Sequence, residues 1–205
     1  MKALLLIDIQ NDFVPGGALA VTDGDAVVPL ANQLQPHFDL VVATQDWHPA
    51  SHGSFASSHP GRQPFEQAEL HGLPQTLWPD HCVQGTPGAE FVASLDQHRI
   101  EAIFRKGTNP AIDSYSGFFD NGHRKSTGLA DYLRGRGVTA VYLAGLAADF
   151  CVYFSALDAL QQGFTLFLVE DATRAISAEG YAQARIDLAQ RGAQFVTTAE
   201  VSSEQ

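Results

Sequence analysis

The sequence predicts an α/β fold, a three-layer doubly wound sheet of about six mainly parallel strands with helices on both faces. Two observations support this prediction. Short apolar runs alternate along the chain with segments of helical periodicity, and each run ends on polar or turn residues. Such alternation favours right-handed crossovers, which return each strand to the same sheet. At 205 residues and 45% hydrophobic content, the chain fits one domain over residues 1–205 with a full core.

The predicted strands are apolar runs of the kind expected for strands buried on both faces of a parallel sheet. They cover residues 3–7, 40–44, 102–104, 140–143, 165–169 and 194–196. Apolar residues at helical spacing predict the helices between them. These helices cover residues 26–34, 128–136, 150–162 and 177–191.

Two long stretches, residues 46–88 and 107–126, do not follow this alternation. They are mostly non-periodic and rich in Pro, Gly, Ser, His and aromatic residues, and loops longer than about 12–15 residues are usually functional or disordered. Their aromatic side chains argue against disorder. We therefore expect ordered lids over the strand ends, and the first lid holds five of the eight histidines.

Charge and composition limit the possible partners. A net charge of −11 disfavours nucleic acid and anionic membranes, because both reward clusters of Lys and Arg. The apolar start of the chain stops at Asp8, too short for a signal sequence, and no run approaches the ~20 residues that span a bilayer. We expect a cytoplasmic protein, in which the two cysteines, Cys82 and Cys151, form no disulfide framework.

Polar residues that could take part in catalysis or ligand binding follow the predicted strands at their carboxyl ends. In open parallel sheets, ligands bind beyond these ends, at the point where the strand order reverses. We expect the following residues to gather on that edge: Asp8, Asp46, His48, Lys106 and Cys151.

Cys151 stands at the predicted start of a helix, directly after a strand that ends in small residues. Free backbone N–H groups at such a position lower a thiol pKa from ~8.5 into a range of roughly 3.5–7.5 and can hold an oxyanion. A nucleophilic role is therefore plausible. A free cysteine more often simply packs in the core, so other residues must decide between the two roles.

Asp46 and His48 suggest a metal site, because side chains two apart in an extended segment share a face. His81 could complete a triad of two histidines and one carboxylate, which suits a catalytic Zn²⁺, Fe²⁺ or Mn²⁺. The pattern is weak evidence by itself. Histidines in loops are more often solvated or hydrogen-bonded than metal-bound, and Cys82 beside His81 is a further possible zinc ligand.

Seven short segments, taken together and in this order, resemble the successive signatures of the bacterial nicotinamidases, also called pyrazinamidases. These enzymes belong to the isochorismatase-like hydrolases. The segments are residues 8–13 (DIQNDF), 16–21 (GGALAV), 46–49 (DWHP), 78–83 (WPDHCV), 105–107 (RKG), 113–118 (DSYSGF) and 145–152 (GLAADFCV). The resemblance covers nearly the whole chain and implies the isochorismatase-like fold.

The resemblance also implies an activity, the hydrolysis of nicotinamide to nicotinic acid and ammonia in NAD salvage, with pyrazinamide as a second substrate. The catalytic triad falls on Asp8, Lys106 and Cys151. Splitting amide hydrolysis into acylation of a thiolate and deacylation by water lowers each barrier. Asp8 would take the thiol proton and later deliver it to ammonia, and Lys106 would stabilise the thiolate. The N–H groups of Ala147 and Cys151 would hold the oxyanion.

By the same resemblance, one divalent metal ion, most simply Zn²⁺, with Fe²⁺ or Mn²⁺ as alternatives, is bound by Asp46, His48 and His81. His52 resembles a fourth ligand of some relatives, and a water molecule is the alternative. The ion would orient the pyridine ring nitrogen or activate water.

The resemblance places further residues around an aromatic amide. Phe13 and Trp78 would sandwich the ring, with plain core packing as the alternative. The remaining pocket residues are Leu19, Val21, Tyr115 and Ala147. The peptide before Ala147 is expected to be cis, and Ala148 stands where many relatives have Thr, so a hydroxyl contact is absent there.

Three other functions fit parts of the pattern. A hydrolase of N-carbamoyl or ureido amides would share the triad but would not need the metal ligands. A non-catalytic thiol sensor or metal scaffold would bind metal without releasing ammonia, and an isochorismate hydrolase would lack the cysteine. A dinucleotide oxidoreductase is disfavoured, because the turn after the first strand, residues 8–12, has no glycine.

Overall fold

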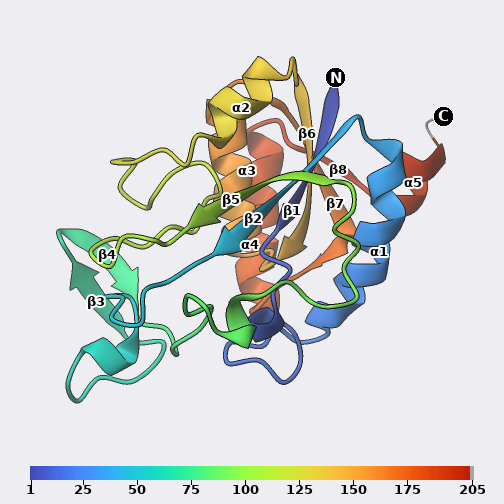
Figure 1. Cartoon of the computed structure of the whole chain (residues 1–205). Helices are drawn as coiled ribbons and strands as arrows, with labels where there is room; N and C mark the ends of the chain where they lie inside the picture. Colours follow the sequence, from blue (N-terminus) through green and yellow to red (C-terminus); the bar gives the residue numbers. More distant parts are fainter. Residues whose placement is uncertain (204–205) are drawn as a thin grey trace.

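The computed structural model describes residues 1–203. Within them, a six-stranded sheet has the order β5-β2-β1-β6-β7-β8, and each neighbouring pair is parallel (Figure 1). The strands are β1 (Lys2–Ile7), β2 (Leu40–Asp46), β5 (Ile100–Lys106), β6 (Ala140–Leu146), β7 (Thr165–Arg174) and β8 (Gln194–Val196). The predicted doubly wound α/β sheet is thereby confirmed.

Helices cover both faces of the sheet (Figure 1). The α-helices are α1 (Val27–Leu34), α2 (Leu129–Gly135), α3 (Cys151–Gln161), α4 (Ala178–Gln190) and α5 (Thr198–Ser203). Residues of α1 and α5 belong to one hydrophobic core, and residues of α2, α3 and α4 belong to the other. Strand β1 contributes to both, because successive side chains alternate: Leu4 and Leu6 join the first core, while Leu5 and Ile7 join the second.

Short 3₁₀ helices occur in the connecting segments. They are η1 (Asn11–Phe13), η2 (Gly24–Ala26), η3 (Gln35–His37), η4 (Ala56–Ser58) and η5 (Pro87–Ala89). Each of the four predicted helices lies within two residues of its observed α-helix, but α5 was not predicted. No helix of the described residues is long and apolar enough to cross a membrane.

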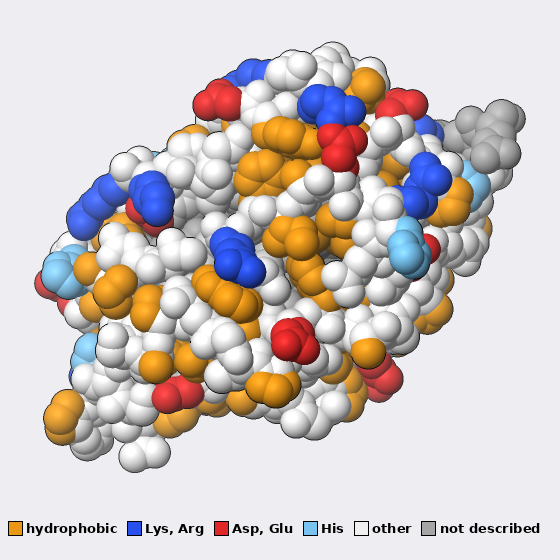
Figure 2. All heavy atoms as spheres, viewed as in Figure 1, with side chains coloured by type: hydrophobic (Ala, Val, Ile, Leu, Met, Phe, Trp, Pro, Cys, Tyr) orange, Lys and Arg blue, Asp and Glu red, His pale blue; other side chains and the backbone are white. Residues whose placement is uncertain are grey.

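Strand β5 differs from the prediction, because it is not buried on both faces. Its residues alternate between half-buried and exposed, and Ile103 is 48% exposed. The reason is its place at the edge of the sheet: α1 packs over β6 and β7, and leaves one face of β5 uncovered. In Figure 2, drawn from the same side as Figure 1, hydrophobic side chains accordingly gather near the middle of the surface, over β5.

The segment of the first predicted lid contains a hairpin that its sequence did not reveal. Strands β3 (Gln67–Leu70) and β4 (Leu73–Thr76) pair antiparallel and project from one end of the molecule (Figure 1). The turn consists of His71 and Gly72, both with positive φ, which is typical of two-residue hairpin turns. The strands are too short and too polar for alternating hydrophobicity to mark them.

The order of the strands reverses between β1 and β6, the central pair of the sheet. Gly145 allows these two strand ends to lie close together: its φ is +124°, and a Cβ atom there would lie 2.1 Å from the Ile7 carbonyl oxygen. The segments that follow β1 and β6 therefore start side by side. Asp8 directly follows β1, and Cys151 is the first residue of α3, the helix after β6.

Candidate active site

Three side chains from separate elements meet at this reversal point. Lys106 ends β5, Asp8 follows β1, and Cys151 is the first residue of α3. Lys106 Nζ lies 2.8 Å from Asp8 Oδ2 and 3.4 Å from Cys151 Sγ. All three residues are buried, at 2%, 0% and 7% exposure respectively. The structure thus brings together the three residues that the sequence suggested as a catalytic triad.

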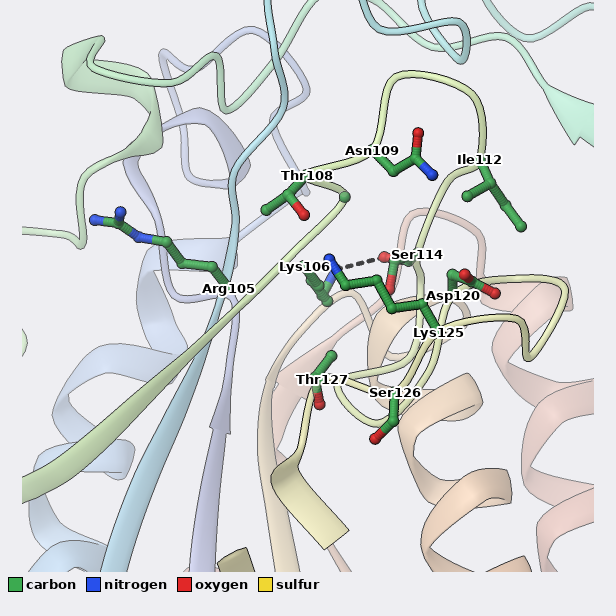
Figure 3. A pocket seen from close by; sticks show the side chains of 11 residues that line it. Arg105, Lys106, Thr108, Asn109, Ile112, Ser114, Asp120, Lys125, Ser126 and Thr127 are labelled. Atoms are coloured by element: carbon green, nitrogen blue, oxygen red, sulfur yellow. Dashed lines mark hydrogen bonds between the residues drawn. The ribbon is translucent and has the colours of Figure 1, made fainter. Parts of the chain in front are cut away.

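Two further acceptors fix the ammonium group of Lys106. It donates a hydrogen bond to Asp46 Oδ1, and a second of 2.9 Å to the Ser114 carbonyl oxygen in the second lid (Figure 3). Burial by itself would lower the pKa of Lys106, but the carboxylates of Asp46 and Asp8 outweigh it and raise that pKa well above its ordinary value. Lys106 is therefore a permanent cation inside the protein.

Asp8 is held as an acceptor in a water-poor position. Its backbone has φ +48°, and its Oδ1 accepts a hydrogen bond of 2.6 Å from the Thr44 hydroxyl. Burial raises the pKa of Asp8, and the opposing effect of Lys106 does not cancel this shift. A carboxylate with a raised pKa is a stronger base than one in water, which suits proton transfer from a thiol.

The pKa of Cys151 corrects one expectation from the sequence. We expected the helix start to lower it, but burial raises it well above its ordinary value, although Lys106 acts in the opposite direction. The negative charges of Asp8 and Asp46 add to the rise. The thiol is therefore neutral at rest and needs a base to become a nucleophile.

Three possible metal ligands lie next to this triad. Asp46, His48 and His81 are all buried, and each offers a ligand atom within 4.8 Å of the others. His81 Nδ1 lies 2.7 Å from the Pro79 carbonyl oxygen and must donate to it, so the lone pair of the neutral ring is on Nε2. That nitrogen lies 3.7 Å from Asp46 Oδ2.

His48 offers a ring nitrogen too, but in this residue it is Nδ1, which has no hydrogen bond among the described residues. Its Nε2 lies 3.1 Å from Asp113 Oδ1, whereas its Nδ1 is buried and has no hydrogen-bond partner among the described residues. Buried polar atoms are nearly always paired, so this orphaned nitrogen points to a missing ligand. Two imidazole nitrogens and one carboxylate oxygen form a donor set that fits Zn²⁺, Fe²⁺ or Mn²⁺.

His52 lies behind this group and does not belong to it. The Ser54 N–H donates to its Nδ1 over 3.1 Å, so the neutral ring carries its proton on Nε2 and has no lone pair left for a metal. His52 forms a cluster with His48 and Asp113, and its ring packs edge-on against His48 at 4.5 Å. His52 therefore packs against a possible ligand, and its own Nε2, like Nδ1 of His48, is buried without a hydrogen-bond partner among the described residues.

A pocket opens between the triad and the ligand group. Of the predicted pocket residues, Phe13, Leu19, Trp78, Tyr115 and Ala147 line it. Val21 does not line the pocket, because its side chain is buried in the core at 1% exposure. Its N–H donates a hydrogen bond to the Phe13 carbonyl oxygen, which keeps Val21 behind the pocket wall. Cys151, Asp46 and His81 also border the pocket, so both chemical groups face one space.

Three lining residues were not predicted, namely Asp113, Phe150 and Ile176. Asp113 and Phe150 lie within segments quoted for the resemblance, next to residues that were assigned roles. The ring of Phe150 packs against Trp78 at 4.9 Å. Ile176 comes from the connection between β7 and α4, and nothing in its local sequence marks it.

The peptide between Leu146 and Ala147 is cis, as the resemblance implies. The Ala147 carbonyl oxygen accepts hydrogen bonds from the N–H groups of Phe150 and Val152. In the described turns and helix starts, neither the Ala147 N–H nor the Cys151 N–H donates to a carbonyl. These two donors are therefore available next to the thiol.

The second cysteine lies in a different environment. Cys82 is 0% exposed, and its Sγ contacts the Gly88 carbonyl oxygen at 3.9 Å. Burial raises its pKa well above the ordinary value, and Asp46, Asp8 and Asp12 add to this effect. Cys82 does not line the pocket, so Cys151 is the cysteine that a substrate could reach.

A separate hollow lies along the segment between the end of β5 and α2 (Figure 3). Its polar lining comes from Thr108, Asn109, Lys125 and Ser126, among others, and it also borders Lys106 and Ser114. Neither the metal-ligand group nor Cys151 borders it. We therefore assign the chemistry to the pocket that contains Cys151.

The parallel α/β sheet places buried Cys, Asp and Lys side chains at its reversal point, the arrangement that the resemblance to the isochorismatase-like hydrolases implies. The chain belongs to the isochorismatase domain family, whose model matches residues 2–200. Within this family, relatives from several organisms are named nicotinamidase or pyrazinamidase.

Nicotinamidase of Escherichia coli is 48% identical over 205 residues, covering 97% of this chain and 96% of that protein. The structure of a nicotinamidase/pyrazinamidase from Acinetobacter baumannii superposes with a TM-score of 0.95 at 47% identity, covering 98% of this chain and 97% of the other. Pyrazinamidase of Pyrococcus horikoshii in complex with zinc gives a TM-score of 0.79 at 40% identity, with 96% and 98% covered.

Proposed function

We propose that this protein is a nicotinamidase, which hydrolyses nicotinamide to nicotinic acid and ammonia and pyrazinamide to pyrazinoic acid. One observation carries the proposal: Asp46, a member of the metal-ligand group, is also hydrogen-bonded to Lys106 of the triad, and both groups border one aromatic pocket. The names and high identities of the relatives support this choice of substrate.

Cys151 is the proposed nucleophile. Because its thiol is neutral at rest, Asp8 takes the proton as Sγ attacks the amide carbon. The resulting negative charge on the amide oxygen would be stabilised by the N–H groups of Ala147 and Cys151, an effect for which the loss of one donor typically costs ~3 kcal/mol. Asp8 then returns the proton to the departing ammonia, and water releases the acid from the thioester.

Lys106 has two tasks in this sequence. At 3.4 Å from Sγ, its positive charge stabilises the thiolate that forms during attack. At 2.8 Å from Asp8, it also opposes the rise in the pKa of that carboxyl group and so keeps it available as a base. The bond to the Ser114 carbonyl oxygen fixes the ammonium group in this position.

The other side of the pocket would recognise the ring. Phe13 and Trp78 provide apolar surfaces for an aromatic ring, and Tyr115 and Phe150 pack against Trp78 and limit its movement. A zinc ion bound by Asp46, His48 and His81 would supply a Lewis acid for the nitrogen of the pyridine ring. Such an interaction would orient the amide group of the substrate over Cys151. An N-carbamoyl substrate lacks such a nitrogen and would make no use of this group.

The deciding experiment is ammonia release by the purified, metal-loaded protein with nicotinamide, pyrazinamide and an N-carbamoyl amino acid in parallel. We expect rapid release from the first two and little from the third. Elemental analysis of the same sample gives the metal content. Metal uptake without ammonia release from any amide would contradict the proposal and favour a metal-binding or thiol-sensing role.

A further inference from the structure

Asp113 makes a contact that the proposed mechanism does not use. Its Oδ1 lies 3.1 Å from His48 Nε2, and both residues are buried, at 3% and 1% exposure. The two residues are 65 positions apart in the chain, and Asp113 belongs to the second lid. A buried carboxylate placed against a possible metal ligand restricts which nitrogen that ligand can offer.

The other contacts of Asp113 are donors, so the carboxylate acts as an acceptor. The Ser114 N–H donates to Oδ1 over 2.8 Å, and Gln75 Nε2 donates to Oδ2 over 3.2 Å. His48 must therefore carry a proton on Nε2 in order to pair with Asp113. In the neutral ring, the lone pair is then on Nδ1, which is the buried nitrogen without a hydrogen-bond partner among the described residues.

Close packing leaves this ring little freedom to turn over. A Cβ atom at Gly107 would lie 2.6 Å from His48 Nε2, so the backbone of Gly107 closes off that side of the ring. His52 and Phe55 pack edge-on against His48 with centroid distances of 4.5 and 5.3 Å. The ring has one hydrogen-bonded edge toward Asp113 and one unpaired nitrogen.

We propose that Asp113 is a positioning residue for the metal site: it holds His48 in the Nε2–H tautomer, so that Nδ1 serves as the metal ligand. This inference rests on the metal site of the proposed function, but not on amide hydrolysis. Carboxylates that accept from a ligating histidine fix the ring and increase its basicity, and their loss typically costs 10–100-fold in metal affinity or activity.

Asp113 also links the metal site to the ring-binding wall. Gln75 Nε2, which donates to Asp113, lies 3.1 Å from the Tyr115 hydroxyl oxygen, and the Trp78 indole N–H donates to the same hydroxyl over 3.3 Å. Removal of the carboxylate would leave the Nε2–H of His48 without its acceptor. It would also release Gln75 from the Asp113 side, so that Gln75 Nε2 keeps only the Thr76 carbonyl oxygen at 2.7 Å and the Tyr115 hydroxyl as acceptors. We therefore expect that Trp78 and Tyr115 orient the aromatic ring of the substrate less well, in addition to weaker metal binding.

The test compares Zn²⁺ binding to the metal-free full-length protein and to three variants, by competition with a chromophoric chelator. Asp113→Ala should weaken binding by about 10–100-fold. Asp113→Asn keeps the shape and one acceptor oxygen but loses the charge, so its affinity should fall between those of Asp113→Ala and wild type. Asp120→Asn is the matched control, because Asp120 lies in the same lid and, among the described residues, its side chain accepts only from the nearby backbone N–H groups of Gly122 and Arg124.

Nitrogen-15 NMR of the histidine rings gives a second readout, which a purely structural role would not move. The neutral His48 ring should be the Nε2–H tautomer in the wild-type protein and a mixture of tautomers in Asp113→Ala. Unchanged zinc affinity in Asp113→Ala and Asp113→Asn, or an Nδ1–H tautomer in wild type, would overturn the inference. Because neither measurement needs turnover, failure of the proposed amidase activity would be visible separately.

Discussion

Lys106 and Asp46 are register partners in adjacent strands, and their side chains are hydrogen-bonded to each other. Asp46 is therefore shared between a cation of the triad and the group that would bind metal. Its own pKa is lowered: burial would raise it, but Lys106 and His48 outweigh that effect. A change of charge at Lys106 therefore alters the electrostatic environment of the metal-ligand group through Asp46, and a change of charge at that group alters the environment of Lys106.

The assignment of the nucleophile is tested by replacing each cysteine. Cys151→Ala should abolish turnover and leave metal content and fold intact, because it removes the thiol without touching a ligand. Cys82→Ala should retain substantial activity, since Cys82 lies in the core outside the pocket. Steady-state ammonia release and elemental analysis check both. A Cys151→Ala protein with near wild-type rate, or alkylation of Cys82 in preference to Cys151, would show that the wrong residue was chosen.

The proton transfer step predicts a pH dependence of activity. Asp8 must be ionised to accept the thiol proton, so kcat/KM should fall as the pH drops through the pKa of Asp8, which burial raises above its ordinary value. Asp8→Asn should be nearly inactive at all pH values, because the base is gone. The measurement is a pH profile of kcat/KM for both proteins, and normal turnover in the variant would require another base.

The cation of the triad predicts a change in thiol reactivity. Lys106→Ala should raise the pKa of Cys151 further, because Lys106 is the neighbour that lowers it. The rate of alkylation of Cys151 at neutral pH should therefore decrease, and turnover should be nearly lost. The rate of iodoacetamide labelling against pH measures this shift; the same profile in the variant and in wild type would mean that Lys106 does not act on the thiol.

The metal can be tested by comparing substrates with and without a ring nitrogen. If bound metal orients the ring, then His48→Ala or chelation should reduce kcat/KM for nicotinamide and pyrazinamide much more than for benzamide. Equal losses of kcat for all three would instead indicate that the metal activates the water that releases the acid. Full activity of a metal-free protein toward nicotinamide would contradict both roles.

His52 predicts a pH dependence of stability in the metal-free protein. Burial lowers its pKa from 6.5 to about 4, which the nearby Asp113 does not prevent. Between these two values the unfolded chain binds more protons than the folded one, so stability decreases as the pH falls from about 6.5 to about 4. The full effect is up to about 3 kcal/mol.

His52→Asn keeps an acceptor for the Ser54 N–H but removes the titration. Urea denaturation of the metal-free wild-type and variant proteins at several pH values between 4 and 7 tests this, and the variant should show the smaller loss on acidification. Parallel stability curves for the two proteins would show that His52 does not stay neutral in the folded state.

The sheet was predictable from the sequence, because apolar runs and helical periodicity are local signals. The strand ends also indicated where Asp8, Asp46, Lys106 and Cys151 would gather, since parallel strands expose their carboxyl ends on one edge. The exposed face of β5 was missed because it depends on which helix covers an edge strand. The same holds for the β3–β4 hairpin, whose pairing rests on a His-Gly turn and not on a hydrophobic pattern.

The finer properties of the site depend on contacts between distant segments. Asp113 reaches His48 from 65 positions away, and Ile176 enters the pocket from a connection with no distinctive residues. The neutral state of the Cys151 thiol follows from burial and two nearby carboxylates, neither of which its own segment contains. Residue type and spacing can suggest a thiol at a helix start, but the surrounding charges decide its protonation.

The neutral thiol of Cys151 has a consequence for the durability of the protein. Peroxides oxidise thiolates to sulfenic and then sulfinic acid, and a protonated, enclosed thiol reacts with them slowly. Because the pKa of Cys151 is raised, its sulfur carries a proton between turnovers, and a thiol reacts with peroxides more slowly than a thiolate does. The same burial that makes attack on an amide depend on Asp8 thus also lowers the intrinsic reactivity of the resting sulfur toward oxidants.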